Sequence, residues 1–464
     1  MSLASREGWS SSRVGVFTDR WTHTALREVI LGKAVEWTEE VTEAQYKSHG
    51  GTSVHMWNRF AWFLILASAA VAQTPAPAAT QRPTPERTLF RAPVVRSPEV
   101  SSDGRVTFRL WAPNAKEVSV TGIAKEPIPM VKDDQGVWSV TTEPLKPDLY
   151  EYSFVVDGLT IADPMNPRIR PTYGRLGRSA VLVPGDVPWS PRPNAPRGAI
   201  TRHFFRSSIA NDERDFFVYT PPNYDARRRQ PYPVLYLLHG WGDDARAWID
   251  IGLANVILDT LIYEGKAVPM VVVAPLAYGT ANGPADINRE DMLPNAVRIL
   301  VEEVMPQVER LYNVSRDRTH RAVAGLSMGG AEALLAGLNH LDKFAWVGSF
   351  SGAFILWPWS RPPLPPASAG EAARPAAPSP DRLRLVVSEL PKVFPRLDRG
   401  VNQQLKLLWI SCGTADMLIR VNREFKQYLD SIGVVARYTE IPDVGHVWPL
   451  WRQNLADFAE LLFK

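Results

Sequence analysis

A serine in a glycine-rich turn is the first residue of the chain whose setting points to chemistry. The stretch Gly325-Leu326-Ser327-Met328-Gly329 follows a short apolar run and leads into a helix-forming segment, 331–338. A Gly-x-Ser-x-Gly pattern between a strand and a helix places the serine hydroxyl on a sharp, exposed turn. Glycine is needed in such a turn where the backbones approach too closely for a Cβ. We therefore predict that Ser327 is a catalytic nucleophile.

A serine hydroxyl needs a base to accept its proton and an acidic group to orient that base. Where the serine lies on such a strand-to-helix turn, these groups follow in the chain order serine, acid, histidine. The histidines after Ser327 are His340 and His446. His340 lies at the end of the helix that follows the serine, several turns from the hydroxyl. We therefore predict His446, in a loop before the last helix, as the base.

The acid that orients the base is predicted to be Asp416. It follows an expected strand, 406–412, and catalytic groups gather at the carboxyl ends of the strands in open α/β sheets. Asp443 is the rival, but it lies too near His446 in the chain to reach the ring easily, and we expect it to be a turn residue.

Two backbone N–H groups are expected to stabilise the oxyanion of a tetrahedral intermediate. One is the N–H of Met328, which follows the nucleophile, and the other comes from the loop after an earlier strand. That loop is 239–244, and we predict the N–H of Trp241 as the donor. His239 is expected to shape the loop and not to act as a base. Candidate substrate contacts are Trp357, Trp359 and Trp448.

Composition excludes several classes of function. Lys and Arg number 52 against 49 Asp and Glu, a net charge of +3, and no basic run is interleaved with aromatic residues, so nucleic-acid binding is not expected. One cysteine, Cys412, allows no internal disulfide and is expected to be a buried hydrophobe. No metal-binding spacing such as His-Glu-x-x-His occurs. We expect no metal and no other cofactor, and the oligomeric state is left open.

The N-terminal part of the sequence indicates export. Residues 56–72 show a positive charge, an apolar core and a final Ala70-Val71-Ala72, the pattern of a cleaved signal peptide. The apolar run 60–72 is shorter than the about 20 residues that a membrane-spanning helix needs. We therefore expect a secreted or periplasmic protein with no membrane association after cleavage. Residues 1–55 are interpreted as an upstream over-extension of the reading frame, and 73–96 as a Pro/Ala-rich linker.

Two folded units are expected after this linker. Period-two alternation at 106–112, 118–120, 137–140 and 150–156, with turn residues between, predicts a small all-β sandwich over 97–184. Trp111 and Tyr152 are expected in its core. A linker, 185–204, precedes apolar strands that alternate with amphipathic helices over 205–464, which predicts a doubly wound, mostly parallel α/β sheet. A Pro-rich stretch, 361–380, is expected to be an insert.

The first unit resembles the immunoglobulin-like modules of glycogen-branching and debranching enzymes, grouped as family-48 carbohydrate-binding modules. The segments that carry this resemblance are 108–115, 136–138, 150–158 and 163–164. It implies contact with glycan. Trp138 is the candidate ring for stacking on a sugar, which requires an exposed face.

The second unit resembles carbohydrate esterase family 1, which includes feruloyl and acetylxylan esterases, with enterobactin esterases and mycolyl transferases as relatives. The segments are 237–242 with Trp248, 265–273, 322–330, 408–416 and 445–452. The resemblance implies an α/β hydrolase fold with Ser327 as nucleophile, Asp416 as acid and His446 as base. Val444 departs from it, because many members have a second glycine there.

The sequence leaves three functions open. The first is a secreted serine esterase that removes feruloyl or acetyl groups from plant polysaccharide or oligosaccharide. The second is a siderophore esterase of the enterobactin type or an acyltransferase. The third is a carbohydrate-binding protein whose esterase domain is inactive.

Overall fold

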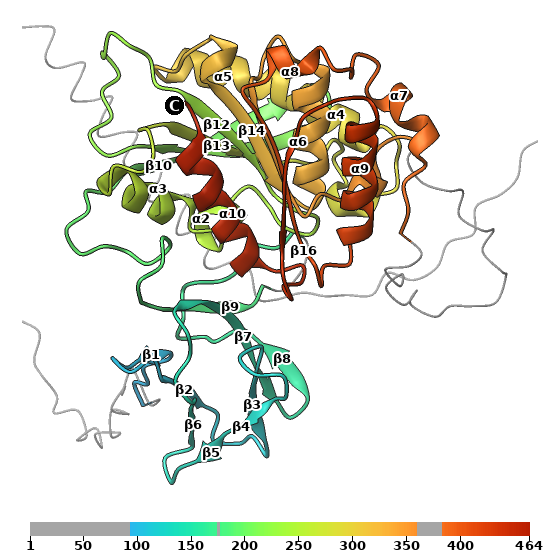
Figure 1. Ribbon diagram of the computed structural model, residues 1–464. Helices are drawn as coiled ribbons and strands as arrows, with labels where there is room; N and C mark the ends of the chain where they lie inside the picture. Colours follow the sequence, from blue (N-terminus) through green and yellow to red (C-terminus); the bar gives the residue numbers. More distant parts are fainter. Residues whose placement is uncertain (1–92, 174–176, 360–382) are drawn as a thin grey trace, which may run out of the picture. The chain divides into compact units, whose positions relative to one another are not determined.

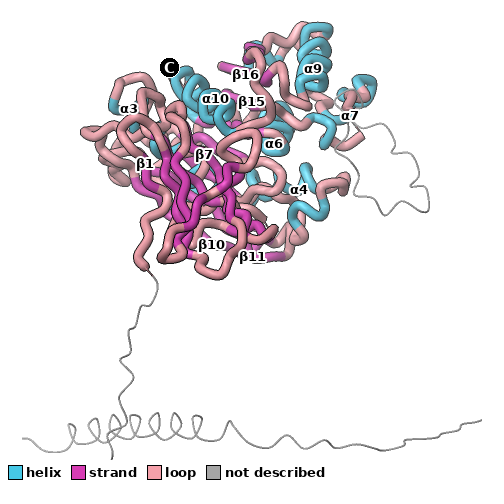
Figure 2. The backbone as a smooth tube through the Cα atoms, turned by 90° about the horizontal axis from the view of Figure 1, so that it is seen from below, coloured by secondary structure: helices cyan, strands magenta, loops and turns pink. Residues whose placement is uncertain are grey.

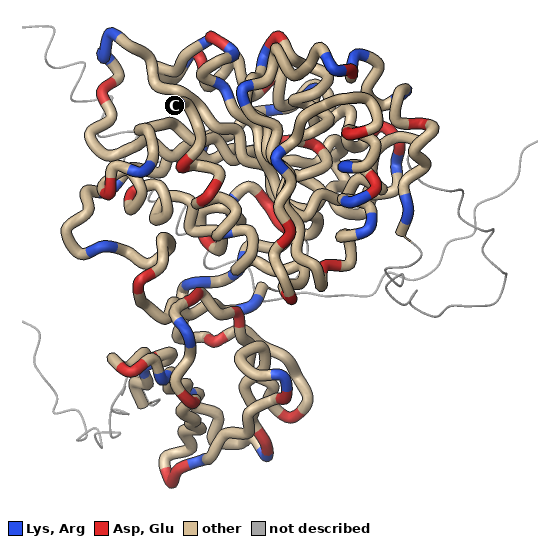
Figure 3. The backbone as a smooth tube through the Cα atoms, in the orientation of Figure 1, with Lys and Arg blue, Asp and Glu red and all other residues tan. Residues whose placement is uncertain are grey.

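The computed structural model describes residues 93–173, 177–359 and 383–464 (Figure 1). All of them belong to one compact unit, Thr88–Lys464. Four predicted segments lie wholly or mostly outside the described residues. They are the upstream stretch 1–55, the signal peptide 56–72, the first linker 73–96 and the Pro-rich insert 361–380. None of the helices in the described part is long and apolar enough to span a membrane. Acidic and basic residues are interspersed along the described chain (Figure 3).

Short antiparallel strands form the N-terminal β module, as predicted. One sheet has the order β1-β2-β6-β5 and the other β4-β3-β7-β8, with β9 paired to β7. The strands are β1 (Glu99–Val100), β2 (Val106–Trp111), β3 (Val118–Thr121), β4 (Ile128–Pro129), β5 (Val131–Lys132), β6 (Val137–Thr141), β7 (Asp148–Val156), β8 (Leu159–Ile161) and β9 (Ser179–Val183). Both sheets contribute to one core, which includes Phe108, Tyr152 and Phe154.

The two tryptophans of the module differ from their predicted roles. Trp138 is 7% exposed and donates its indole N–H to the carbonyl of Ala112 at 2.9 Å. The prediction that Trp138 stacks on glycan is wrong, because a buried ring offers no face to a sugar. Trp111 was expected in the core but is 38% exposed. It is out of phase with the buried residues of β2, which are Val106, Phe108 and Leu110.

An eight-stranded sheet forms the second part, in the order β10-β11-β13-β12-β14-β15-β16-β17. From β13 to β17 all neighbours are parallel, and β10 and β11 join as antiparallel strands. The strands are β10 (Ala199–Ser207), β11 (Asp212–Thr220), β12 (Val234–Leu238), β13 (Val271–Pro275), β14 (Arg321–Leu326), β15 (Trp346–Phe350), β16 (Leu407–Gly413) and β17 (Arg437–Ile441). This is the predicted doubly wound α/β hydrolase sheet. The predicted linker 185–204 is wrong at its end, because the largely exposed edge strand β10 starts inside it.

Helices cover both faces of this sheet. Alternate residues of β12 enter two different cores, Tyr236 on one face and Leu237 on the other. The helices are α2 (Ala247–Asp250), α3 (Ala254–Tyr263), α4 (Met292–Arg298), α5 (Met305–Leu311), α6 (Met328–Asn339), α7 (Leu390–Val393), α8 (Val401–Gln404), α9 (Ile419–Ser431) and α10 (Trp448–Leu461). Helices α3 and α10 lie side by side on one face, whereas α4, α6 and α9 pack on the other (Figures 1 and 2). Both faces are therefore apolar, as the sequence predicts.

Two helical segments of this part are irregular. The first is α4, a π-helical turn (Ile299–Val304) and α5 in succession. Pro306 in the first turn of α5 has no N–H to donate, which interrupts regular α-helical hydrogen bonding. The second is a 3-10 turn (Val387–Glu389) followed directly by the short helix α7.

Candidate active site

Ser327 lies on a strained turn between β14 and α6. Its φ of 53° and ψ of −115° lie outside the regions that a serine ordinarily adopts. The turn needs glycine on both sides, because a Cβ on Gly325 would come within 2.3 Å of the Gly329 carbonyl oxygen. A Cβ on Gly329 would come within 2.5 Å of the Leu238 carbonyl oxygen. The structure thus has the nucleophile elbow that the sequence predicts.

The three predicted catalytic side chains meet in one line of hydrogen bonds. His446 Nε2 lies 3.0 Å from Ser327 Oγ, and His446 Nδ1 lies 2.8 Å from Asp416 Oδ2. Asp416 is 2% exposed, and its other oxygen accepts the backbone N–H of Leu418 at 2.8 Å. An Nδ1–H donated to Asp416 leaves Nε2 able to accept the serine proton. The geometry is therefore that of a base between a nucleophile and its orienting acid.

The loops that carry Asp416 and His446 are joined by backbone hydrogen bonds. The N–H of Ala415 donates to the carbonyl of Val444 at 3.1 Å. Asp443 has a φ of 58° and donates its N–H to Thr414 Oγ1 at 2.9 Å, so it is the turn residue that we expected. A Cβ on Gly413 would lie 2.0 Å from the Val444 carbonyl oxygen, which shows how closely the loops approach. Val444 holds the loops together through its carbonyl, so the missing glycine does not disturb the contact.

The predicted oxyanion loop passes next to the nucleophile. A Cβ built on Gly240 would lie 3.5 Å from the Cβ of Ser327. The loop turns back at once, because Asp243 donates its N–H to the Gly240 carbonyl at 3.2 Å and Gly242 has a φ of 86°. Trp241 lies between these residues. We call 240–243 the oxyanion turn.

Met328, whose N–H is the other predicted donor, is the first residue of α6. The first N–H groups of a helix have no partner within it and point along the positive end of its dipole. Met328, next to Ser327 in the chain, and the oxyanion turn, next to it in space, thus both lie beside the nucleophile as predicted.

His239 has a structural role, as we expected. It is 1% exposed, its Nδ1 donates to the Gly240 carbonyl at 2.9 Å and its Nε2 accepts the N–H of Ala277 at 2.9 Å. These contacts require the neutral ring, and burial lowers the pKa of His239 to about 4. His239 therefore joins the oxyanion turn to the loop after β13.

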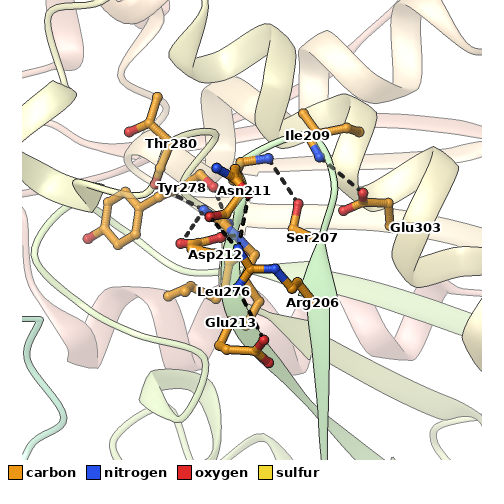
Figure 4. Close-up of polar contacts among 12 residues, drawn as sticks. Arg206, Ser207, Ile209, Asn211, Asp212, Glu213, Leu276, Tyr278, Thr280 and Glu303 are labelled. Carbon is orange, nitrogen blue, oxygen red and sulfur yellow. Dashed lines mark hydrogen bonds and ion pairs between the residues drawn. The ribbon is translucent and has the colours of Figure 1, made fainter.

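The loop after β13 is held by a buried arginine, Arg214. Its guanidinium donates to the backbone carbonyls of Leu276, Tyr278 and Thr280 and pairs with Asp212. These partners are labelled in Figure 4. The Tyr278 hydroxyl in turn accepts the N–H of Gly242 at 2.8 Å and donates to the Asp243 carbonyl at 3.0 Å. Arg214 thus supports one side of the oxyanion turn through Tyr278.

A cavity of about 470 Å³ opens over the nucleophile. Its walls come from the catalytic loops, the oxyanion turn, the start of α10 and the β module. The lining residues are Gly122, Asp148, Leu149, Tyr150, Glu151, Arg170, Arg178, Gly240, Trp241, Asp243, Leu326, Ser327, His446, Val447, Trp448, Pro449 and Trp451. Acidic, basic and aromatic side chains therefore surround the serine. In the described part of the chain, no cluster of three or more His, Cys, Asp or Glu side chains could hold a metal ion.

Comparison with known families agrees with this site. Residues 207–461, more than half of the chain, match the family described as "Putative esterase". The chain belongs to this esterase family. Residues 96–166 match carbohydrate-binding module 48, the isoamylase N-terminal domain. Both predicted resemblances are confirmed, and membership of the family supports carboxylic ester hydrolase activity.

Individual relatives carry more specific names. The chain is 32% identical over 384 residues to an endo-1,4-beta-xylanase/feruloyl esterase of Xylanibacter ruminicola, a match that covers 79% of this chain and 46% of the relative. It is 27% identical over 206 residues to an iron(III) enterobactin esterase of Escherichia coli, covering 43% and 47% respectively. The chain thus spans less than half the length of these two relatives. A solved enterobactin esterase from Shigella flexneri shares the fold, with a TM-score of 0.53, 20% identity and coverage of 77% and 92%.

The esterase places only one of the three predicted substrate contacts at the cavity. Trp448 is 5% exposed and lines it. Trp357 is 1% exposed, stacks on Phe354 and donates its indole N–H to the Ala331 carbonyl, so its prediction as a substrate contact is wrong. Trp359 is 51% exposed but lines a separate cavity of about 270 Å³, so that prediction is wrong too. Both residues lie a few positions after β15 in the chain, but this closeness in sequence does not determine which way their rings point.

Other residues of the cavity were not found from the sequence. Trp451 packs edge-on against the His446 ring, with the ring centroids 4.8 Å apart. Its place one helical turn after Trp448 was an available signal. Glu151 on β7 and Arg170 between β8 and β9 both belong to the β module, and no local pattern connects them to a serine far along the chain.

We predict that His239 makes folding stability depend on pH. Its pKa rises from about 4 in the folded chain to 6.5 in the unfolded chain, so the unfolded chain binds the extra proton between these values. The contribution of neutral His239 to the free energy of unfolding is fully present above pH 6.5. About 3 kcal/mol of it is lost as pH falls towards 4. The measurement is the free energy of unfolding of wild type and His239→Gln at pH 7 and pH 4.

The difference in stability between these two proteins should shrink by about that amount at pH 4. Asp243, whose pKa burial raises to about 6, acts with the opposite sign, but it is common to both proteins and largely cancels. A pH-independent difference would contradict the neutral, structural role of His239.

Proposed function

We propose that this chain is a serine esterase that cleaves carboxylic esters through an acyl-enzyme on Ser327. The observation that carries the proposal is the hydrogen-bonded line from Ser327 Oγ through His446 to Asp416. Ser327 and His446 line a cavity of about 470 Å³, large enough for an ester with an aromatic acyl group.

Acylation follows from this geometry. His446 Nε2 takes the proton of Ser327 as Oγ attacks the ester carbonyl carbon, and Asp416 stabilises the resulting imidazolium through Nδ1–H. The carbonyl oxygen becomes an oxyanion, which accepts hydrogen bonds from the backbone N–H groups of Met328 and Trp241. One such donor is worth about 3 kcal/mol of barrier. When the tetrahedral intermediate collapses, the bond to the alcohol oxygen breaks and His446 gives its proton to the departing alcohol.

Deacylation repeats the sequence with water. His446 takes a proton from water, the hydroxide oxygen attacks the acyl carbon, and the acid leaves as the proton returns to Ser327 Oγ. An acyltransferase would use an alcohol in place of water at this step. The His446 side chain is 20% exposed, so either water or an alcohol could approach it.

The proposed substrate is a feruloyl or acetyl ester on plant polysaccharide or its oligosaccharides. Support comes from the names of the relatives, a xylanase/feruloyl esterase and an acetyl esterase of Caldicellulosiruptor saccharolyticus, and from the carbohydrate-binding-type module. The half-exposed Trp241 on the cavity wall offers a surface for an aromatic acyl group.

A siderophore ester of the enterobactin type is the second candidate. The observation that favours it is the solved enterobactin esterase, whose match extends over 77% of this chain. The third possibility, an inactive esterase domain on a binding protein, has no support from the site, because the triad is intact and hydrogen-bonded.

Secretion or a periplasmic location remains part of the proposal. When the full sequence is expressed in a bacterial host, we expect the exported protein to begin at Gln73, after the small-residue site at 70–72. Mass spectrometry of the N-terminal peptide measures this. A mature protein that keeps residues 56–72, or one retained in the cytoplasm, would contradict it.

Removal of the nucleophile is the direct test of the mechanism. We expect Ser327→Ala to lower kcat on p-nitrophenyl acetate by about 10⁴-fold or more, because the acyl-enzyme cannot form. Asp416→Asn should lower kcat by a similar order, because an amide no longer favours the reactive tautomer of His446. As a matched control, Asp430→Asn, at an exposed position of α9, should leave kcat unchanged. Ser327→Ala with wild-type turnover would end the proposal.

A panel of esters separates the substrate candidates. Methyl ferulate, feruloylated arabino-oligosaccharide, acetylated xylan and a cyclic catecholate triester would be compared by kcat/KM. We expect the feruloylated or acetylated saccharides to be the best substrates. A preference for the catecholate triester by tenfold or more would replace them with the siderophore assignment.

A further inference from the structure

The oxyanion turn carries a buried carboxylate that the proposed chemistry does not use. Asp243 is 2% exposed and ends the turn. Burial raises the pKa of its carboxyl to about 6, and Arg170 opposes that rise. A carboxylate in such a place is tolerated only when a cation and hydrogen bonds compensate for its lost hydration.

Arg170 supplies this compensation from the segment that connects β8 to β9. Its Nε and Nη2 lie 3.2 and 2.7 Å from Asp243 Oδ1. Its Nη1 donates to both oxygens of Glu151 on β7, at 3.3 and 3.0 Å. Arg170 therefore lies between two carboxylates, one on the β module and one on the oxyanion turn.

The same segment contacts the turn at a second point. Tyr173 donates its backbone N–H to the Gly242 carbonyl at 3.0 Å, and its ring packs edge-on against Tyr278 with centroids 5.3 Å apart. Tyr278 approaches the turn from the loop after β13, which Arg214 holds. The turn is thus fixed from two sides, and Arg170 makes the charged contact on the side of the module.

We propose that Arg170 is a positioning residue for the reaction, acting through Asp243 to fix the Trp241 N–H at the site of the oxyanion. This rests on the proposed serine esterase function. Trp241 is separated from Asp243 only by Gly242, whose backbone is permissive. A turn with a glycine at this point keeps its shape only if its end is held. Displacement of an oxyanion donor by about 1 Å costs catalysis, because the donor must match the transition state.

Through Arg170, the β module takes part in catalysis even on small esters that carry no sugar. Arg170→Gln removes the cation, and Arg170→Lys keeps a cation without the planar two-point contact. The matched control is Arg168→Gln. Arg168 is exposed and belongs to the same segment, and its hydrogen bonds found in the described residues are made by its own backbone N–H and carbonyl.

The experiment measures kcat and KM on p-nitrophenyl acetate, with active sites counted by titration with an organophosphate so that misfolded protein does not enter the rate. We expect kcat to fall by about 10- to 100-fold in Arg170→Gln and less in Arg170→Lys, with KM within about twofold of wild type. Affinity for phenylboronic acid, which forms a tetrahedral anion on the serine, should fall by the same factor as kcat. Arg168→Gln should retain the wild-type values.

Two results would overturn the inference. An unchanged kcat in Arg170→Gln, or in Arg170→Lys if the first variant does not fold, would show that the turn does not need this contact. A raised KM with unchanged kcat and boronate affinity would make Arg170 a substrate contact. Ser327→Ala, measured alongside, keeps the two proposals apart: if it is inactive while Arg170 variants are normal, only the positioning role fails.

Discussion

The site depends on one ring, His446, which must reach a serine on one loop and an aspartate on another at the same time. The distances of 3.0 Å to Ser327 Oγ and 2.8 Å to Asp416 Oδ2 leave little room for error. Parallel strands supply that precision, because β14, β15, β16 and β17 are neighbours in register and end at the same edge of the sheet. The hydrogen bond from Ala415 to Val444 then fixes the acid loop to the histidine loop. The remaining structure serves to keep this edge rigid and to surround it.

Rigidity at the serine comes from close backbone contact. The positive φ of Ser327 persists because β14, α6 and the end of β12 meet where only glycine fits. The oxyanion turn beside it has weaker local support, since it contains two glycines and a half-exposed tryptophan. It depends on contacts from elsewhere, through His239 and Tyr278 on one side and through Arg170 on the other. The β module also contributes to the core on the α10 side, because Leu149 belongs to the same buried cluster as Trp448 and Trp451. Buried Arg452 of α10 donates to Asp148. The module is therefore integrated with the catalytic part of the chain.

Local pattern predicts the parts of this site that are local in the chain. The elbow, the apolar strands and the order of serine, acid and histidine follow from short motifs, and the structure brings Ser327, Asp416 and His446 together as predicted. Strand phase would also have placed Trp111 outside the core, because Val106, Phe108 and Leu110 are the buried residues of β2. No sequence pattern shows which way the rings after the elbow point. The predicted substrate contacts Trp357 and Trp359 are therefore wrong. The edge strand β10 lacks alternating apolar residues, so the sequence does not distinguish its first residues from the linker before it. The contact between Arg170 and Asp243 joins residues far apart in sequence, and only the folded chain reveals it.

We propose that His446 and Asp416 make Ser327 nucleophilic. The most direct measurement is covalent labelling with a fluorophosphonate, followed by tandem mass spectrometry of the peptides. We expect a single modification at Ser327 in the native protein, and its loss in His446→Gln even though the serine is still present. Labelling of another serine, or undiminished labelling of Ser327 without His446, would contradict it.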